Sequence, residues 1–222
     1  MATASTTFPP DAASDYDVRI PRLVPGYGLA GELATAILTR LLPDGARILV
    51  AGCGTGSELA RLAAANASWR FVGLDPSPAM LARAQARLAA SKDEARVQWV
   101  AAPLGASDLP PCDAALAFLV DHFIPDDGAR AGFLAALAAP LRPGASALLF
   151  HHAGGRWDGA YGQWLRMQDG ADDPDAVIAR IAAKWHPLAP DRRRVLLAEA
   201  GFGAPHVFFS ALAYEGIITV RG

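Results

Sequence analysis

Short apolar runs of β-type residues alternate with helical segments along most of the chain, and this rhythm restricts the fold more than any other sequence feature. Five such runs precede residue 152. They span residues 47–51, 69–74, 96–101, 114–120 and 145–151. A strand followed by a helix and another strand predicts a parallel sheet with helices on both of its faces.

The first helix is expected over residues 27–42, where four large apolar side chains recur at every fourth position. They are Leu29, Leu33, Ile37 and Leu41. This spacing predicts an apolar stripe that faces the core. A shorter helix is expected over residues 57–65.

Two further helices have recognisable end signals. Ser77 followed by Pro78 is typical of a helix start, and this helix is expected to reach residue 90. The helix after Asp127 is expected to include Leu141, with Pro140 kinking or ending its last turn.

The rhythm breaks in the last third of the chain. The expected helices there span residues 157–167, 174–185 and 190–200, and the expected β-runs span residues 205–212 and 216–221. No strand separates the first two helices, so residues 154–189 form a helical insertion or lid. The final two runs are close enough in sequence to pair antiparallel.

The expected fold is therefore α/β: a Rossmann-like, doubly wound, mostly parallel seven-stranded sheet with an antiparallel C-terminal strand and a helical insertion before strand six. A length of 222 residues usually makes one domain, here residues 16–222. Residues 1–15 are small, polar and acidic, and they are expected to be a flexible N-terminal tail.

A glycine-rich turn directly follows the first β-run and reads Gly52-Cys53-Gly54-Thr55-Gly56. A ligand packed against such a turn needs backbone without Cβ at the point of contact. In open α/β sheets, ligands bind beyond the carboxyl ends of the strands. A pyrophosphate fingerprint requires a third glycine where this chain has Ser57, which argues against dinucleotide binding. The alternative interpretation is that the glycines only form a tight turn between a strand and a helix.

An acidic residue ends the second β-run. Asp75 stands 19 residues after Gly56, where a carboxylate can accept hydrogen bonds from a ribose diol. It is followed by Pro76, Ser77 and, later, Met80. The alternative interpretation makes Asp75 a helix cap and Met80 a core residue.

Together these motifs resemble the class I S-adenosylmethionine-dependent methyltransferase family, over roughly residues 45–222. The resemblance implies S-adenosylmethionine as cofactor, S-adenosylhomocysteine as product, and a single methyltransferase domain. The cofactor-binding residues that it implies are Tyr27, Gly52, Cys53, Gly54, Thr55, Gly56, Asp75, Pro76, Met80, Pro103, Leu104 and Phe118.

The third motif departs from the family pattern. Many members carry an acid after the third strand that binds the adenine amino group, whereas this chain has Pro103, Leu104 and Gly105. Backbone near Leu104 is the expected substitute, because Asp108 lies late in the loop.

The segment before the first helix, Val24-Pro25-Gly26-Tyr27, is similar to one in the tRNA uridine carboxymethyltransferase group. In that group the N-terminal region closes over the amino-acid end of the cofactor. The resemblance implies that Arg22 and Tyr27 face the cofactor carboxylate. An ordinary proline–glycine turn explains the same residues.

The catalytic candidates lie at the ends of the fourth and fifth β-runs. Asp121 and His122 end the fourth run, and His151 and His152 end the fifth. We select His122 and His151, although a structural role for His122 stays equally open. Adjacent strand residues point to opposite faces, so only one of the last two histidines is expected to face substrate.

The insertion carries aromatic residues that are candidates for a wall over the acceptor or for core packing. They are Trp157, Tyr161 and Trp164. The spacing of His, Cys, Asp and Glu matches no metal site, and Cys53 and Cys112 form no paired motif.

A formal net charge of −2 argues against nucleic acid binding, and Arg192-Arg193-Arg194 is typical of a solvated helix face. The sequence shows no signal peptide and no apolar run of about 18 residues, so we expect a cytoplasmic protein without membrane contact. A homodimer is compatible with the sequence.

The preferred function is methyl transfer to a small-molecule O, N or carboxylate acceptor. The alternatives are a tRNA-modifying enzyme that uses an S-adenosylmethionine-type cofactor, a non-catalytic S-adenosylmethionine-binding protein and, more distantly, a NAD-linked oxidoreductase.

Overall fold

The computed structural model describes residues 15–155, 157–168 and 173–222. Its strands form a single seven-stranded sheet in the order β3-β2-β1-β4-β5-β7-β6. The strands are β1 (Arg47–Ala51), β2 (Arg70–Leu74), β3 (Val97–Val100), β4 (Cys112–Phe118), β5 (Leu141–His152), β6 (His206–Ala211) and β7 (Tyr214–Val220). The first five strands pair in parallel, and β7 pairs antiparallel with both β5 and β6. The expected α/β fold is confirmed.

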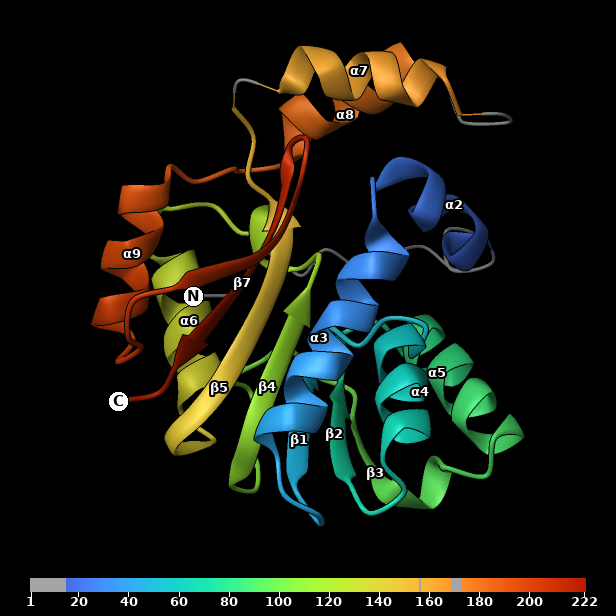
Figure 1. Ribbon diagram of the computed structural model, residues 1–222, viewed down its shortest axis with the longest axis vertical. Helices are drawn as coiled ribbons and strands as arrows, with labels where there is room; N and C mark the ends of the chain where they lie inside the picture. The colour runs from blue at the N-terminus through green and yellow to red at the C-terminus, as the bar shows by residue number, and fades with distance from the viewer. Residues whose placement is uncertain (1–14, 156, 169–172) are drawn as a thin grey trace.

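Helices cover both faces of this sheet (Figure 1). One face packs against α3 (Tyr27–Leu41), α4 (Ser57–Ala65) and α5 (Pro78–Ala90), and the other against α6 (Ala129–Ala138) and α9 (Pro190–Glu199). Because strand side chains alternate between the two faces, the core divides into two buried clusters. The parallel strands are therefore apolar on both sides, as the continuous β-type runs predict.

The last third contains the two expected insertion helices, α7 (Asp158–Arg166) and α8 (Pro174–Lys184), above the carboxyl ends of the central strands (Figure 1). They lie beside α2 (Tyr16–Leu23), a helix that contains Pro21 and that the sequence analysis did not predict. The Tyr161 hydroxyl of α7 donates to the carbonyl of Leu23 at 2.8 Å, so these elements are joined. Of the expected N-terminal tail, residues 1–14 lie outside the described residues.

The predicted apolar stripe of α3 is wrong for its three leucines, while its fourth member, Ile37, packs partly against the core. Leu29 and Leu41 are 51% and 52% exposed, and Leu33 is also exposed. The buried side of the helix instead carries Ala30, Gly31, Ala34 and Leu38. These mostly small residues let α3 approach its neighbours closely, and this close packing outweighs the burial of larger side chains on the opposite face.

The helix after Asp127 is shorter than expected. It ends at Ala138, and Leu141 begins β5 instead of closing the helix. Pro140 therefore ends the helix, since its ring is incompatible with a further helical turn.

In the part of the chain that the structure describes, no helix is both long and apolar enough to cross a membrane.

Candidate functional site

The backbone of the glycine turn after β1 adopts left-handed conformations that residues with a side chain rarely adopt. Gly52, Gly54 and Gly56 have φ angles of 66°, 53° and 81°. A Cβ at Gly52 would lie 2.5 Å from Val120 Cγ2, and one at Gly56 would lie 2.9 Å from Ala84 Cβ. A Cβ at Gly54 would meet nothing within 4 Å. Two glycines thus allow close packing, and the third faces open space.

Asp75 lies directly beside this open position. Its carboxylate is 7% exposed and accepts hydrogen bonds from the backbone N–H of Gly54, at 2.9 Å, and of Ser77, at 2.8 Å. Burial raises the pKa of the Asp75 carboxyl, and the two backbone bonds oppose this shift. One bond goes to each oxygen, so each oxygen can accept a further donor.

Three more of the predicted cofactor-binding residues are buried. Cys53 is buried and its N–H donates to the Leu74 carbonyl, which ties the turn to β2. Met80 is buried in the first turn of α5, where its N–H donates to Ser77 Oγ. Phe118 is buried at the end of β4.

The remaining residues predicted near the adenine lie closer to the surface. Pro76 follows Asp75 and is half-buried. In the loop after β3, Pro103 is exposed and Leu104 packs partly against the core.

Helix α2 contributes an acidic residue that sequence reasoning did not select. Asp17 accepts hydrogen bonds from Thr55 Oγ1 at 2.6 Å and Ser57 Oγ at 3.3 Å, and it forms an ion pair with Arg87. The partners lie 38 to 70 positions away in sequence, so no local pattern indicates the contact. Asp17 therefore holds α2 against the glycine turn.

Tyr27 also makes an unexpected contact. Its hydroxyl donates to Glu58 Oε1 at 2.5 Å, and burial raises the pKa of both groups. Arg22 lies in the last turn of α2 and is exposed. Because a buried carboxylate repels another anion, the Tyr27–Glu58 pair does not favour a cofactor carboxylate at the Tyr27 hydroxyl.

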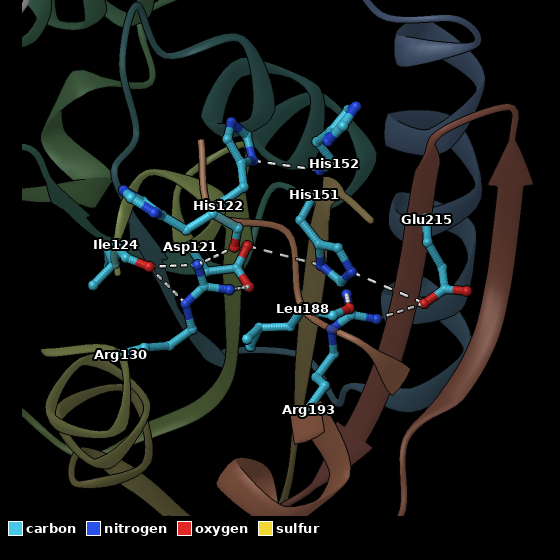
Figure 2. A network of polar contacts seen from close by, with 10 residues as sticks. Asp121, His122, Ile124, Arg130, His151, His152, Leu188, Arg193 and Glu215 are labelled. Carbon is cyan, nitrogen blue, oxygen red and sulfur yellow. Dashed lines mark hydrogen bonds and ion pairs between the residues drawn. The ribbon is translucent and has the colours of Figure 1, made fainter. Parts of the chain in front are cut away.

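The four polar residues that end β4 and β5 are brought together, as Figure 2 shows. Asp121 and His122 lie in the short helix η2 (Asp121–Phe123), and His151 and His152 are the last residues of β5. All four are buried. The two adjacent histidines point to opposite faces of the sheet, as predicted.

His151 lies in a row of charged side chains, buried except for the half-buried Glu215, on the face of α6 and α9. Its Nδ1 is 3.8 Å from Asp121 Oδ1 and its Nε2 is 3.9 Å from Glu215 Oε2. Arg130 lies 3.9 Å from Asp121, and Arg193 lies 2.8 Å from Glu215, so an arginine ends the row at each side. Burial, followed by both arginines, holds the pKa of His151 well below its usual value.

This row also corrects the expectation for the arginine triplet. Arg192 and Arg194 pair with acidic groups at the surface, as predicted for a solvated face. Arg193 is 4% exposed and bonds Glu215 and the Leu188 carbonyl. The reason is helical periodicity: one side of α9 faces the sheet, and the middle residue falls on that side. Glu215 also lines a surface groove of about 640 Å³.

His152 and His122 face the insertion. The ring of His152 lies 5.1 Å from the rings of both Trp185 and Tyr214, and 6.1 Å from the ring of Tyr161. The ring of His122 lies 4.3 Å from the Trp185 ring. Two imidazoles and three larger aromatic rings therefore meet under α7 and α8.

Of the aromatic residues proposed for a wall over the acceptor, only Tyr161 is fully buried. Trp164 stacks on Tyr161 and is half-buried, and Trp157 is 47% exposed. Trp185 was not selected from the sequence, although it contacts both imidazoles. Within residues 15–155, 157–168 and 173–222, no group of His, Cys, Asp and Glu is arranged to hold a metal ion.

Comparisons with known proteins find similarity to methyltransferases and to carboxy-S-adenosyl-L-methionine synthases. A family model described as a methyltransferase domain matches residues 49–147. The chain is 26% identical to the carboxy-S-adenosyl-L-methionine synthase of Chromohalobacter salexigens over 98% of this chain and 84% of that protein. It is 30% identical to the trans-aconitate 2-methyltransferase of Variovorax paradoxus over 76% of this chain and 58% of that protein.

The chain spans about half of the first curated relative, 47% of its length, and between 31% and 84% of the lengths of the others. Among solved structures, magnesium protoporphyrin IX methyltransferase from Synechocystis PCC 6803 aligns with a TM-score of 0.67 and 16% identity, over 89% of this chain and 84% of that one. This likeness shows a shared fold.

Proposed function

We propose that this chain, which belongs to the class I S-adenosylmethionine-dependent methyltransferase family, transfers a methyl group from S-adenosylmethionine to a small-molecule O, N or carboxylate acceptor. The observation that carries the proposal is the juxtaposition of Gly54 and Asp75. An open backbone position and a buried carboxylate lie one hydrogen bond apart at the carboxyl ends of β1 and β2.

The residues at this corner fit the cofactor. Asp75 has lone pairs for the two ribose hydroxyls, and the open side of Gly54 allows close approach of the amino-acid arm. Met80, Pro103 and Leu104 offer apolar contact for the adenine. The other residues proposed to contact the cofactor are Gly52, Cys53, Thr55, Gly56, Pro76 and Phe118, together with Tyr27 through its ring, since its hydroxyl is bonded to Glu58.

The chemistry places few demands on the protein. When bound, S-adenosylmethionine supplies a methyl carbon on a sulfonium, so an acceptor lone pair forms the new bond while the C–S electron pair returns to sulfur. Any acceptor proton leaves to a base or to solvent. The chain has to align the acceptor and exclude water, a role that we assign to the ends of β4 and β5 and to the insertion.

A second candidate function follows from the similarity across nearly the whole chain to a carboxy-S-adenosyl-L-methionine synthase. In this alternative the cofactor itself would be modified. Mass analysis of the nucleoside after turnover distinguishes the two: methyl transfer yields S-adenosylhomocysteine, and synthesis yields a heavier, carboxylated S-adenosylmethionine.

Calorimetry with S-adenosylhomocysteine tests the proposal. We expect measurable binding to the wild-type chain and a loss of about 10- to 100-fold in Asp75→Asn, because the charged acceptor of the ribose hydroxyls is removed. Asp126→Asn is the control, since that carboxylate lies on the surface and pairs with Arg192. No heat of binding for either S-adenosylmethionine or S-adenosylhomocysteine, with NADH bound instead, contradicts the proposal.

A further inference from the structure

Polar atoms without partners gather at the ends of β4 and β5. Five buried nitrogen and oxygen atoms there have no hydrogen-bond partner in the described chain. They are Asp121 Oδ1, His122 Nε2, His151 Nδ1, His151 Nε2 and His152 Nδ1. Asp121 Oδ1 and the two His151 nitrogens have ionisable groups 3.8–3.9 Å away on the face of α6 and α9, whereas His122 Nε2 and His152 Nδ1 belong to the rings that face the insertion. Buried polar atoms in folded proteins are nearly always paired, so the two unpaired atoms on the insertion side indicate a place where a ligand or ordered water supplies the partners.

One of these atoms has a defined protonation state. The backbone N–H of His152 donates to Nδ1 of His122 at 3.4 Å, so Nδ1 acts as an acceptor (Figure 2). A neutral imidazole carries its single proton on the other nitrogen. His122 therefore presents Nε2–H, a buried donor with no partner among the described residues.

The surroundings keep this ring uncharged. The His122 ring packs against both Phe123 and Trp185, each 4.3 Å away between ring centroids, and these two rings also contact each other. Burial lowers the pKa of His122 to about 3; nearby Asp121 opposes this shift, while the other titratable groups near the ring reinforce it. These other groups are His151, His152 and Arg130. At neutral pH the ring can donate a hydrogen bond but does not take up a proton.

We propose that His122 binds the methyl acceptor as a hydrogen-bond donor, through Nε2–H, to an oxygen of a planar aromatic molecule. The inference rests on the proposed function and specifies the acceptor end of that site. In this role His122 aligns the acceptor and is not the general base.

The class of acceptor follows from the aromatic side chains that surround the imidazoles of His122 and His152. Trp185, Tyr161 and Tyr214 surround His152, and Trp185 also contacts His122 with the two rings tilted by 44°. Aromatic side chains of this kind favour a flat apolar ring.

The nearby cations do not favour a highly charged acceptor. Arg130 bonds the carbonyls of Ile124 and His186, and Arg193 bonds Glu215 and the Leu188 carbonyl. Both guanidinium groups already have partners, so neither is free to pair with a charged acceptor beside the imidazoles. A multiply charged acceptor would therefore lose its hydration without gaining an ion pair.

We assign the entry of the acceptor to the position of Trp185. It is half-buried and directly follows α8, and the N–H of His186 donates to the His122 carbonyl at 2.7 Å. The insertion is thus joined to the end of β4 at this point. The proposed binding mode requires the indole to move, so that the acceptor ring takes its place against the imidazole.

The test uses the full chain saturated with S-adenosylhomocysteine, and 4-nitrophenol as a planar hydroxyl probe. His122→Gln retains an N–H near the position of Nε2 but cannot act as a base, whereas His122→Phe retains only the ring. We expect the dissociation constant of 4-nitrophenol to stay within about threefold in His122→Gln and to rise at least tenfold in His122→Phe. The matched control, His206→Gln, changes an exposed histidine at the start of β6.

Nitrogen NMR of the ¹⁵N-histidine-labelled protein provides an independent readout. We expect His122 to remain neutral, with its proton on Nε2, from pH 5 to 8, and we expect this proton to shift when 4-nitrophenol binds. Citrate, a tricarboxylate of comparable size, is expected not to bind.

Several results overturn the inference. They are titration of His122 between pH 5 and 8, a proton on Nδ1, tighter binding of citrate than of 4-nitrophenol, no binding of 4-nitrophenol, and unchanged binding in His122→Phe. If His122→Phe does not fold, His122→Asn replaces it, because its shorter amide cannot reach the same acceptor. Absence of S-adenosylhomocysteine binding would instead refute the proposed function, so the two failures are distinguishable.

Discussion

Single residues at the glycine turn have separate tasks. Gly52 and Gly56 lack a Cβ because neighbouring side chains already occupy that space, whereas Gly54 faces an open position beside Asp75. The same left-handed backbone therefore serves packing at two positions and ligand approach at the third.

Gly54→Ala tests this division at the residue scale. The left-handed φ of 53° makes the substitution unfavourable by about 1–2 kcal/mol of folding free energy, and the new methyl group points into the proposed cofactor space. We expect binding of S-adenosylhomocysteine to fall at least tenfold by calorimetry. Gly45→Ala is the matched control, since Gly45 has a φ of 77° and open space but lies in the turn before β1. Equal binding by both variants contradicts the assignment.

Among the elements, α3 shows how packing departs from a simple apolar pattern. Its large leucines lie on the exposed side, and a row of mostly small residues that ends in Leu38 faces the core. Because α3 lies close to α4 and β6, small residues at its contact positions matter as much as the apolar area that it buries.

A pair of identical truncations tests this orientation of α3. Leu38 is fully buried, so Leu38→Ala is expected to lower the free energy of unfolding by about 2–5 kcal/mol. Leu41→Ala removes the same atoms from a side chain that is 52% exposed, and we expect a change within about 0.5 kcal/mol. Urea denaturation measures both. A larger loss in Leu41→Ala than in Leu38→Ala would show that the leucine stripe faces the core after all.

For the whole molecule, folding places ionisable groups where water cannot reach them. His122, His151 and His152 are all buried, and burial lowers the pKa of each. The unfolded chain binds protons at these residues more readily than the folded chain does. Acid therefore favours unfolding through these histidines, starting below the ordinary histidine pKa of about 6.5.

His151→Gln is expected to reduce the sensitivity of the folded protein to acid. Removing one buried histidine should flatten the decline of unfolding free energy between pH 6.5 and 5 by up to about 1.4 kcal/mol per pH unit, because one fewer proton is taken up on unfolding. Chemical denaturation of both proteins at several pH values measures the difference. Parallel curves would mean that His151 is protonated in the folded state.

Local sequence by itself determined the succession of elements and one corner of the site. The strand runs and the Ser77–Pro78 helix start depend on neighbours within a few residues, and they are found close to where the sequence predicts them. The positions of the glycine turn and of Asp75 could also be predicted from the sequence, since each comes directly after a parallel strand. Their roles in cofactor binding, like the roles of Tyr27, His122 and His151, stay predictions.

Only the tertiary structure decided which polar groups meet. Alternation along β5 predicts that His151 and His152 diverge, but the pairing of β5 with β7 and the position of the insertion decide which of them lies under α8. The contacts of Asp17 with Thr55 and of Tyr27 with Glu58 join segments more than 30 residues apart. Such contacts depend on how whole elements pack, and packing is a property of the assembled core that no local pattern contains.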